Sequence, residues 1–149
     1  GIPHFAISIA LRTNKEIVSG LIFDPIKNEM FYAEKNNGSF FNNQRIRVSK
    51  KKKLEECLFA TGGKKEMSNS LNTRKSGSAA LDMAYVGSGR YDGYFQKYLN
   101  IWDIASGIII VKEAGGKISE VDCSNSKDHE VFAASNAVYE KMLENLNNF

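Results

Sequence analysis

The sequence predicts a mixed α/β protein, with an antiparallel sheet in its first part and alternating strands and helices in its second part. Three observations support this. Short apolar segments separated by turn signals, such as Asp24-Pro25 and Asn36-Asn37-Gly38, fill the first fifty residues. Residues 101–116 form a long, almost wholly apolar segment that ends in Gly115-Gly116. Residues 137–146 have the amphipathic spacing of a terminal helix.

The first part reads as an antiparallel meander of five strands. They are expected at residues 5–11, 16–23, 29–34, 39–41 and 44–48. The Asn36-Asn37-Gly38 triplet is a hairpin signal between the third and fourth strands. We expect residues 1–53 to be the antiparallel-sheet part of a truncated N-terminal subdomain.

The second part alternates strands with helices, and we expect residues 54–149 to form a C-terminal βα subdomain. Strands are expected at 57–61, 92–96, 117–121 and 131–134, and residues 62–73 read as a loop. Helices are expected at 78–86, 102–114 and 137–146. Ser78 and Asn136 are the candidate N-caps of the first and last of these helices.

Composition narrows the function classes. The chain has 149 residues, 42% hydrophobic and 25% charged, which is ordinary for a globular domain. A net charge of +3 is too small for a dedicated nucleic-acid binder. Cys57 and Cys123 are far apart and read as free thiols of a reducing compartment. No apolar run has the length of a membrane span. We therefore expect a cytoplasmic location and no membrane contact.

Two predicted helices begin with small or acidic residues, namely the segment 75–80 and the pair Trp102-Asp103. A helix start presents free N–H groups and partial positive charge, and small residues let a ligand approach the backbone. A carboxylate there also suits Mg²⁺, which prefers oxygen ligands. The simpler interpretation, and the commoner one for an Asp at a helix start, is that Asp103 only caps its helix.

Several motifs together resemble the inositol monophosphatase family. WDIASGIIIVKEAGG, from Trp102 to Gly116, resembles the second signature of that family. RKSGSAALDMAYVGSGRYDGYF, from Arg74 to Phe95, resembles the segment before it. GIPHFAISIAL and VFAASN also fit, so the resemblance covers nearly the whole chain and is nearest to bacterial extragenic-suppressor-type members.

The resemblance implies a Mg²⁺-dependent phosphomonoesterase on a layered α-β-α-β-α fold, incomplete here at the N-terminus. It implies that Asp103 binds a metal ion and the substrate hydroxyl beside the phosphate. Gly77, Ser78 and Ala79 would contact the substrate, a small phosphorylated polyol or sugar. Trp102 would be structural. A homodimer is expected for the full-length protein.

One part of the family pattern is missing. The first signature is an Asp-Pro-Ile/Leu-Asp-Gly-Thr loop that holds metal ions and, with an upstream Glu, activates water. Asp24-Pro25 lacks the second Asp and the Gly-Thr and reads as a turn, so we reject it as the metal loop. We expect the loop, and the water-activating Glu and Thr, to lie before Gly1, so that no catalytic residue lies in this chain. A single carboxylate cannot hold two Mg²⁺ ions, so we expect this chain alone to be inactive.

Two departures leave the substrate open. Gln96 stands where much of the family has an acidic residue that binds a substrate hydroxyl, and residues 62–73 are shorter than the usual connection. The alternatives are another sugar or nucleotide phosphate as substrate, or a non-catalytic role in RNA- or transcription-associated binding. Asp82 and Asp92 read as a helix-face charge and a turn residue. If helices are missing from one sheet face, that face should expose an apolar patch.

Overall fold

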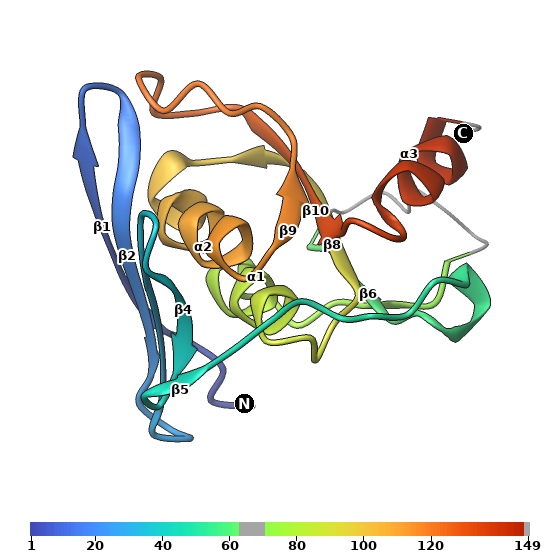
Figure 1. Cartoon of the computed structure of the whole chain (residues 1–149), viewed down its shortest axis with the longest axis horizontal. Coiled ribbons are helices and arrows are strands. Elements are labelled where there is room, and N and C mark those ends of the chain that lie inside the picture. Colours follow the sequence, from blue (N-terminus) through green and yellow to red (C-terminus); the bar gives the residue numbers. More distant parts are fainter. Residues whose placement is uncertain (63–70, 148–149) are drawn as a thin grey trace.

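Two five-stranded sheets enclose a pair of helices, and a third helix lies on the far side of the second sheet (Figure 1). This computed structural model describes residues 1–62 and 71–147. Three helices are described: α1 (Ala79–Gly87), α2 (Ile101–Glu113) and α3 (Tyr139–Asn147), with a short 3-10 helix at Leu54–Glu56. The described layers are therefore β-α-β-α, which agrees with the predicted sandwich without its first helical layer.

The first sheet is an antiparallel meander in the order β1-β2-β3-β4-β5. Its strands are β1 (Ile7–Thr13), β2 (Glu16–Asp24), β3 (Glu29–Glu34), β4 (Gly38–Phe41) and β5 (Gln44–Arg45). Alternate residues of the middle strands face the helices. Ile22, Phe31 and Ala33 are fully buried there, packed against α1 and α2. The predicted alternation of the first part is thus confirmed.

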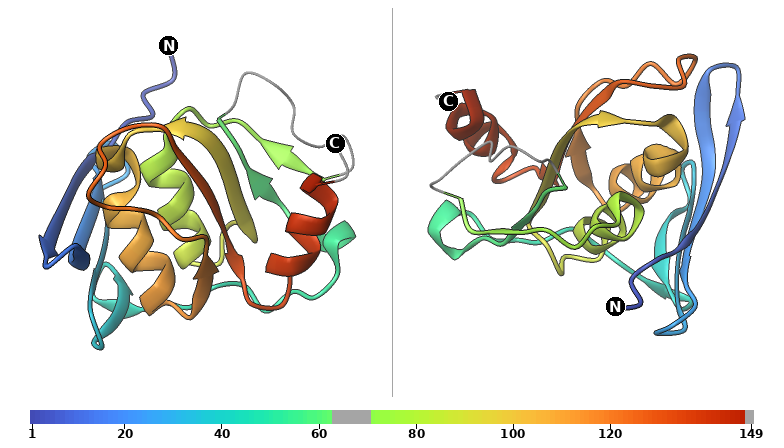
Figure 2. Two further views of the ribbon diagram at one scale, coloured as in Figure 1. Left: turned by 90° about the horizontal axis from the view of Figure 1, so that it is seen from above. Right: turned by 180° about the vertical axis from the view of Figure 1, so that it is seen from behind.

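The second sheet has the order β7-β6-β8-β10-β9 and is mixed. Its strands are β6 (Phe59–Ala60), β7 (Thr73–Arg74), β8 (Gly93–Leu99), β9 (Gly116–Ile118) and β10 (His129–Ser135). β6 runs parallel to β7 and β8, whereas β10 is antiparallel to both β8 and β9. One face of this sheet packs on α1 and α2, and the other packs on α3. Figure 2 shows the same order of layers from two further directions.

The two central helices run side by side in the same direction. A Cβ atom added to Gly107 would lie 2.6 Å from Met83 Cβ, and one added to Gly87 would lie 2.7 Å from Ile110 Cγ2. The step from Met83 to Gly87 along α1 therefore matches the step from Gly107 to Ile110 along α2, so the two helices are parallel. Extending this register backward brings the start of α1 beside Asp103, near the start of α2. Glycine at both positions permits the close approach of the two helix axes.

The predicted elements are found, with differences that have local reasons. β5 is shorter than the predicted strand 44–48, because the chain leaves the first sheet there and the Val48 N–H donates to the Ala114 carbonyl at 3.2 Å. Asn136 was expected to cap the last helix. That expectation was wrong, since α3 begins at Tyr139 and the Asn136 side chain donates to the Gly115 carbonyl at 3.1 Å.

Other boundaries moved by a few residues. β7 is a strand at the end of the predicted loop 62–73, of which residues 63–70 lie outside the described residues. Gly115 has a φ of +85°, so the predicted left-handed end of α2 is confirmed. The predicted division between residues 53 and 54 stays a prediction. No described helix is long and apolar enough to cross a membrane.

The outer face of β1 is apolar and open to solvent. Ile7, Ile9 and Leu11 are 51%, 61% and 60% exposed. On the neighbouring strand, Phe23 pairs with Ile7 and Leu21 pairs with Ile9, so these side chains point to the same outer face. β1 is also the edge strand of its sheet. An apolar face beside an open strand edge is a typical site of association.

We expect a charge on this face to reduce self-association. Ile9→Glu should shift sedimentation velocity profiles of the protein toward the monomer, because a glutamate in the middle of the apolar strip opposes burial of that strip. Ile26→Glu is the control, since Ile26 is similarly exposed, at 53%, but lies in the β2–β3 turn, outside the apolar face of β1. Equal sedimentation of both variants and the unchanged protein, at all concentrations, would contradict the expectation.

Candidate functional site

Asp103 lies in the first turn of α2, and only one of its oxygens is occupied. The backbone N–H and the side-chain amide of Asn100, the N-cap residue, donate to Asp103 Oδ2 at 3.2 and 3.3 Å. The capping role is therefore confirmed for that oxygen. Oδ1 has no hydrogen-bond partner within the part of the chain that the structure describes, and the residue is partly exposed. The carboxylate can thus cap its helix and still accept a ligand.

The segment before α1 is held in shape by two serines. The Ser78 side chain accepts a hydrogen bond from the Leu81 N–H at 3.4 Å, which confirms Ser78 as the N-cap. The Ser76 hydroxyl accepts from the Ser78 N–H at 3.2 Å. Gly77, between them, has a φ of +93°, and a Cβ added to it would meet nothing within 4 Å. The backbone at Gly77 is therefore open to an approaching ligand.

Asp82 is a buried carboxyl that sequence reasoning assigned wrongly. It is 1% exposed rather than a solvated charge on a helix face. The Ser76 hydroxyl donates to Asp82 Oδ1 at 2.6 Å, so Asp82 supports the segment before α1 from behind. Burial raises the pKa of Asp82 to about 7, and the hydrogen bond from Ser76 opposes this only in part. The available signal was its sequence setting, Leu81-Asp82-Met83-Ala84, in which every neighbour is apolar.

Both helix starts are directed toward the same part of β8. Because α1 and α2 are parallel, Gly77, Ser78 and Ala79 lie at the same end of the helix pair as Asp103. The hydroxyl of Tyr94, on β8, is close enough to both helices for a carboxylate of each to affect its pKa. Burial raises the pKa of its hydroxyl, and the charges of Asp82 and Asp103 raise that pKa further. The structure therefore brings together four of the predicted site residues.

The fifth predicted residue, Gln96, lies on β8 beside the same tyrosine. The Tyr94 hydroxyl donates to Gln96 Oε1 at 2.7 Å. A Cβ added to Gly62 would lie 2.1 Å from that oxygen, so only glycine leaves room for this side chain. The Gln96 side chain lies against Tyr94 and Gly62, and no hydrogen bond among the described residues joins it to Asp103 or to the segment before α1.

A complete metal centre is not formed by the described residues. Within residues 1–62 and 71–147, no three His, Cys, Asp or Glu side chains are grouped closely enough to hold a metal ion. Asp24, in the Asp-Pro pair, accepts from the Ile26 N–H, the Lys27 N–H and the Lys27 ammonium at 2.9, 3.1 and 2.9 Å. It therefore closes its own turn. Asp103 fits Mg²⁺ as one oxygen ligand, and a whole coordination shell needs further ligands.

A small cavity adjoins the first turn of α2. It has a volume of about 160 Å³ and lies between β1 and the helix, lined by Ser8, Ala10, Ile101, Trp102, Ala105 and Ser106. Trp102 is 56% exposed there, and its structural role stays a prediction. A larger cavity, of about 230 Å³, lies along the C-terminal half of α2, away from Asp103.

Two sheets with a pair of parallel helices between them define a layered α/β fold. A model of the inositol monophosphatase family matches residues 1–148, and the chain belongs to that family. It is 38% identical over 163 residues to a Haemophilus influenzae protein named Nus factor SuhB, covering 98% of this chain and 61% of that protein. It is 44% identical over 129 residues to a Thermotoga maritima protein named fructose-1,6-bisphosphatase/inositol-1-monophosphatase, covering 80% of this chain and 50% of that one.

Solved structures agree with the fold. The extragenic suppressor protein SuhB of Bartonella henselae superposes with a TM-score of 0.90 at 39% identity, covering 98% of this chain and 65% of the other. The chain therefore spans about half to two thirds of the length of these relatives. The family and the fold are therefore established.

Proposed function

We propose that this chain supplies the substrate-binding part and one metal ligand of a Mg²⁺-dependent phosphomonoester hydrolase. The observation that carries the proposal is the pair of parallel helices whose starts adjoin, one bearing the carboxylate of Asp103 and the other the open backbone at Gly77. Free N–H groups at two helix starts suit an anionic or polyhydroxyl ligand. Membership of the inositol monophosphatase family supports the reaction class.

Each residue has a role in this proposal. Asp103 would use its unoccupied Oδ1 for Mg²⁺ and for the substrate hydroxyl beside the phosphate. Gly77, Ser78 and Ala79 would bind the polyol or sugar through the backbone. Gln96 would hydrogen-bond a substrate hydroxyl from β8, although the Tyr94 hydroxyl already occupies its Oε1. When bound, Mg²⁺ supplies charge neutralisation at the phosphoryl oxygens and an activated water.

A paramagnetic ion tests the metal ligand directly. Mn²⁺, which shares oxygen ligands with Mg²⁺, should broaden the NMR amide signals of Ile101–Ile104 and of Gly77–Ser78 before any others. Asp103→Asn should abolish this selective broadening. The matched control is Asp122→Asn, an exposed aspartate whose Oδ1 accepts from Ser124. Broadening that first appears elsewhere, or that survives Asp103→Asn, would refute Asp103 as the ligand.

The same proposal includes the expectation that this chain alone does not turn over substrate, because one carboxylate cannot complete a two-metal centre. A phosphate-release assay with inositol monophosphate and Mg²⁺ checks it. Sustained turnover by the purified chain, lost in Asp103→Asn, would contradict that expectation while supporting the role of Asp103.

A second candidate function is transcription-associated binding, which the name of the Haemophilus influenzae relative favours. The chain has two lysine runs, at residues 50–53 and 64–65, that are candidates for such binding. Lys51 pairs with Asp92 at 3.0 Å and Lys53 with Glu56 at 3.3 Å, while residues 64–65 lie outside the described residues. Binding of transcription factors that is unchanged by Asp103→Asn would separate this function from hydrolysis. The homodimer, the cytoplasmic location and the identity of the phosphomonoester stay predictions.

A further inference from the structure

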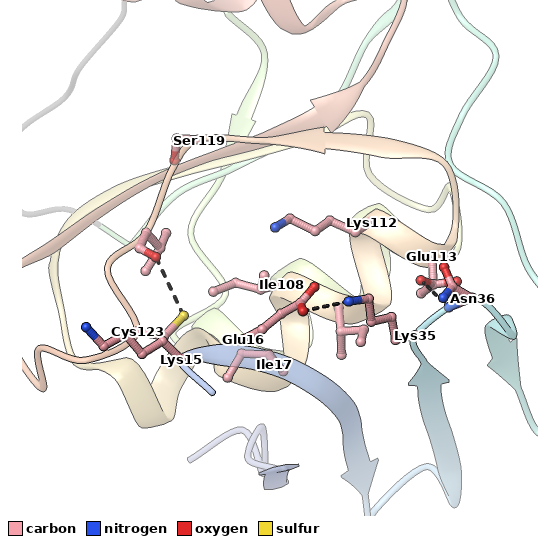
Figure 3. Close-up of a pocket in the computed structure, with 12 residues that line it drawn as sticks. Lys15, Glu16, Ile17, Lys35, Asn36, Ile108, Lys112, Glu113, Ser119 and Cys123 are labelled. Carbon is pink, nitrogen blue, oxygen red and sulfur yellow. Dashed lines mark hydrogen bonds and ion pairs between the residues drawn. The ribbon is translucent and has the colours of Figure 1, made fainter. Parts of the chain in front are cut away.

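The larger cavity lies at the opposite end of α2 from the candidate site. Ten residues separate Asp103 from Glu113, which corresponds to about 15 Å along a helix axis. The cavity, of about 230 Å³, is enclosed by the β1–β2 turn, the end of β3, the C-terminal half of α2 and residues 119–123 (Figure 3). It therefore shares no lining residue with the proposed substrate site.

The floor and walls of this cavity differ in chemistry. Ile17, Ile108, Ile109 and Val121 provide an apolar floor. The walls carry three lysines and two glutamates, namely Lys15, Lys35, Lys112, Glu16 and Glu113. An apolar floor with a few charged groups is the lining that small-molecule sites have, and the volume of about 230 Å³ is below the usual range of about 300–1,000 Å³, so it suits only a small ligand.

The two glutamates are already engaged by the protein. Glu113 accepts from the Asn36 N–H at 2.9 Å and from the Gly38 N–H at 3.0 Å, one with each oxygen. Glu16 pairs with the Lys35 ammonium at 2.6 Å. Both carboxylates of the walls are therefore paired within the protein, and Lys35 is the one lysine of the three that is paired with them.

The ammonium groups of Lys112 and Lys15 have no hydrogen bond or ion pair to any residue that the structure describes. The Lys112 side chain extends into the space between Ser119 and Ile108, and Lys15 lies beside Cys123 at the side of the cavity (Figure 3). Burial raises the pKa of the Cys123 thiol, while the charges of Lys112 and Arg12 lower it in part. The lining therefore has three lysines against two glutamates, and the charge of Lys15 also acts on Asp122, whose pKa it helps to lower. Lys112 is the cation of the lining that no described carboxylate pairs with.

We propose that this cavity binds a small organic anion, with its anionic headgroup at Lys112 and its apolar body on Ile17, Ile108 and Val121. A lysine ammonium is a compact charge that accommodates either a phosphate or a carboxylate headgroup. The apolar floor selects against inorganic ions, which bury no apolar surface.

The test is a methyl NMR titration of the protein with phenylphosphonate in the presence of EDTA, which removes metal-dependent binding at Asp103. The methyl signals of Ile17, Ile108, Ile109 and Val121 should shift together and saturate in the millimolar range. Lys112→Gln should weaken this binding by about tenfold, the loss expected for one ion-paired headgroup contact. Benzoate distinguishes a carboxylate from a phosphate-type preference, and inorganic phosphate should bind more weakly than phenylphosphonate.

The matched control is Lys127→Gln, an exposed lysine outside the cavity lining that should leave the affinity unchanged. The proposal is overturned if the methyl shifts do not saturate, if they arise at residues outside the cavity, or if Lys112→Gln and Lys127→Gln bind phenylphosphonate equally. It is independent of the hydrolase proposal, because Asp103→Asn should bind phenylphosphonate as the unchanged protein does.

Discussion

Gly20→Ala is expected to lower the free energy of unfolding by about 2–3 kcal/mol, because a methyl group has no room between β2 and α2. The added Cβ would lie 2.7 Å from Ile109 Cγ2, 2.8 Å from Ser106 Cα and 2.9 Å from the Ser106 carbonyl oxygen. Two of these three atoms belong to the helix backbone, so rotation of a side chain cannot relieve the clash. α2 would have to move away from the sheet as a unit.

The same contact fixes the position of Asp103. The Ser106 hydroxyl donates to the Ile9 carbonyl at 2.8 Å and is 3.0 Å from the Ser8 hydroxyl, so α2 is fastened to β1 at the point where Gly20 allows close approach. Asp103 precedes Ser106 by about one helical turn. A displaced helix should therefore also weaken the Mn²⁺ effect at Asp103.

The measurement is chemical denaturation of Gly20→Ala. Ser19→Ala is the control, because Ser19 is the preceding residue of β2 and is only partly buried. Replacing glycine by alanine at a negative φ ordinarily stabilises by about 0.4–1 kcal/mol through the unfolded chain. A lower free energy of unfolding for Gly20→Ala would therefore mean that the clash outweighs this stabilising effect. If Gly20→Ala is as stable as the unchanged protein, the helix and the sheet are not in the close contact described.

Local sequence signals predicted most elements of the fold, for reasons visible in particular residues. α2 was predicted within one residue at each end, because Trp102-Asp103 and Gly115-Gly116 bound the apolar segment. Asn136 misled because a side chain suited to a cap is equally suited to a carbonyl 21 residues away in sequence, and only the fold brings Gly115 near it. The two-residue strand β7 has no period that a sequence could display.

The site shows the same division between local and long-range information. The capping role of Ser78 and the helical position of Asp103 follow from neighbouring residues. The parallel pairing of α1 with α2 does not, because it depends on Gly87 and Gly107 meeting residues more than twenty positions away. Gln96 was selected by resemblance alone, and its contact with Gly62 was not foreseeable from spacing. The cationic cavity is likewise assembled from segments that are distant in sequence.

Asp82→Asn is expected to stabilise the protein at about pH 8 by an amount on the order of 4 kcal/mol. Burial raises the pKa of Asp82 from 3.8 to about 7, so the folded state keeps a proton that the unfolded state releases. Below the unfolded value both states are protonated and the buried carboxyl imposes no charge penalty. As the pH rises from about 4 to 7, the folded state holds more protons than the unfolded state, so stability falls. Above pH 7 the penalty is complete and constant.

Asparagine carries no charge at any of these pH values and can still accept the hydrogen bond from Ser76. The difference in unfolding free energy between Asp82→Asn and the unchanged protein should therefore be small near pH 4 and grow until about pH 7. Urea denaturation across this range measures this difference.

Asp92→Asn is the matched control, because Asp92 is equally buried but accepts from the Leu58 N–H at 2.7 Å and from the Lys51 ammonium at 3.0 Å. Because Asp92→Asn replaces the ion pair with Lys51 by a neutral contact, it should lower the free energy of unfolding by about 1 kcal/mol. A pH-independent difference for Asp82→Asn would mean that its carboxyl is solvated in the folded state, and Asp82 would then not be the buried support of the segment before α1.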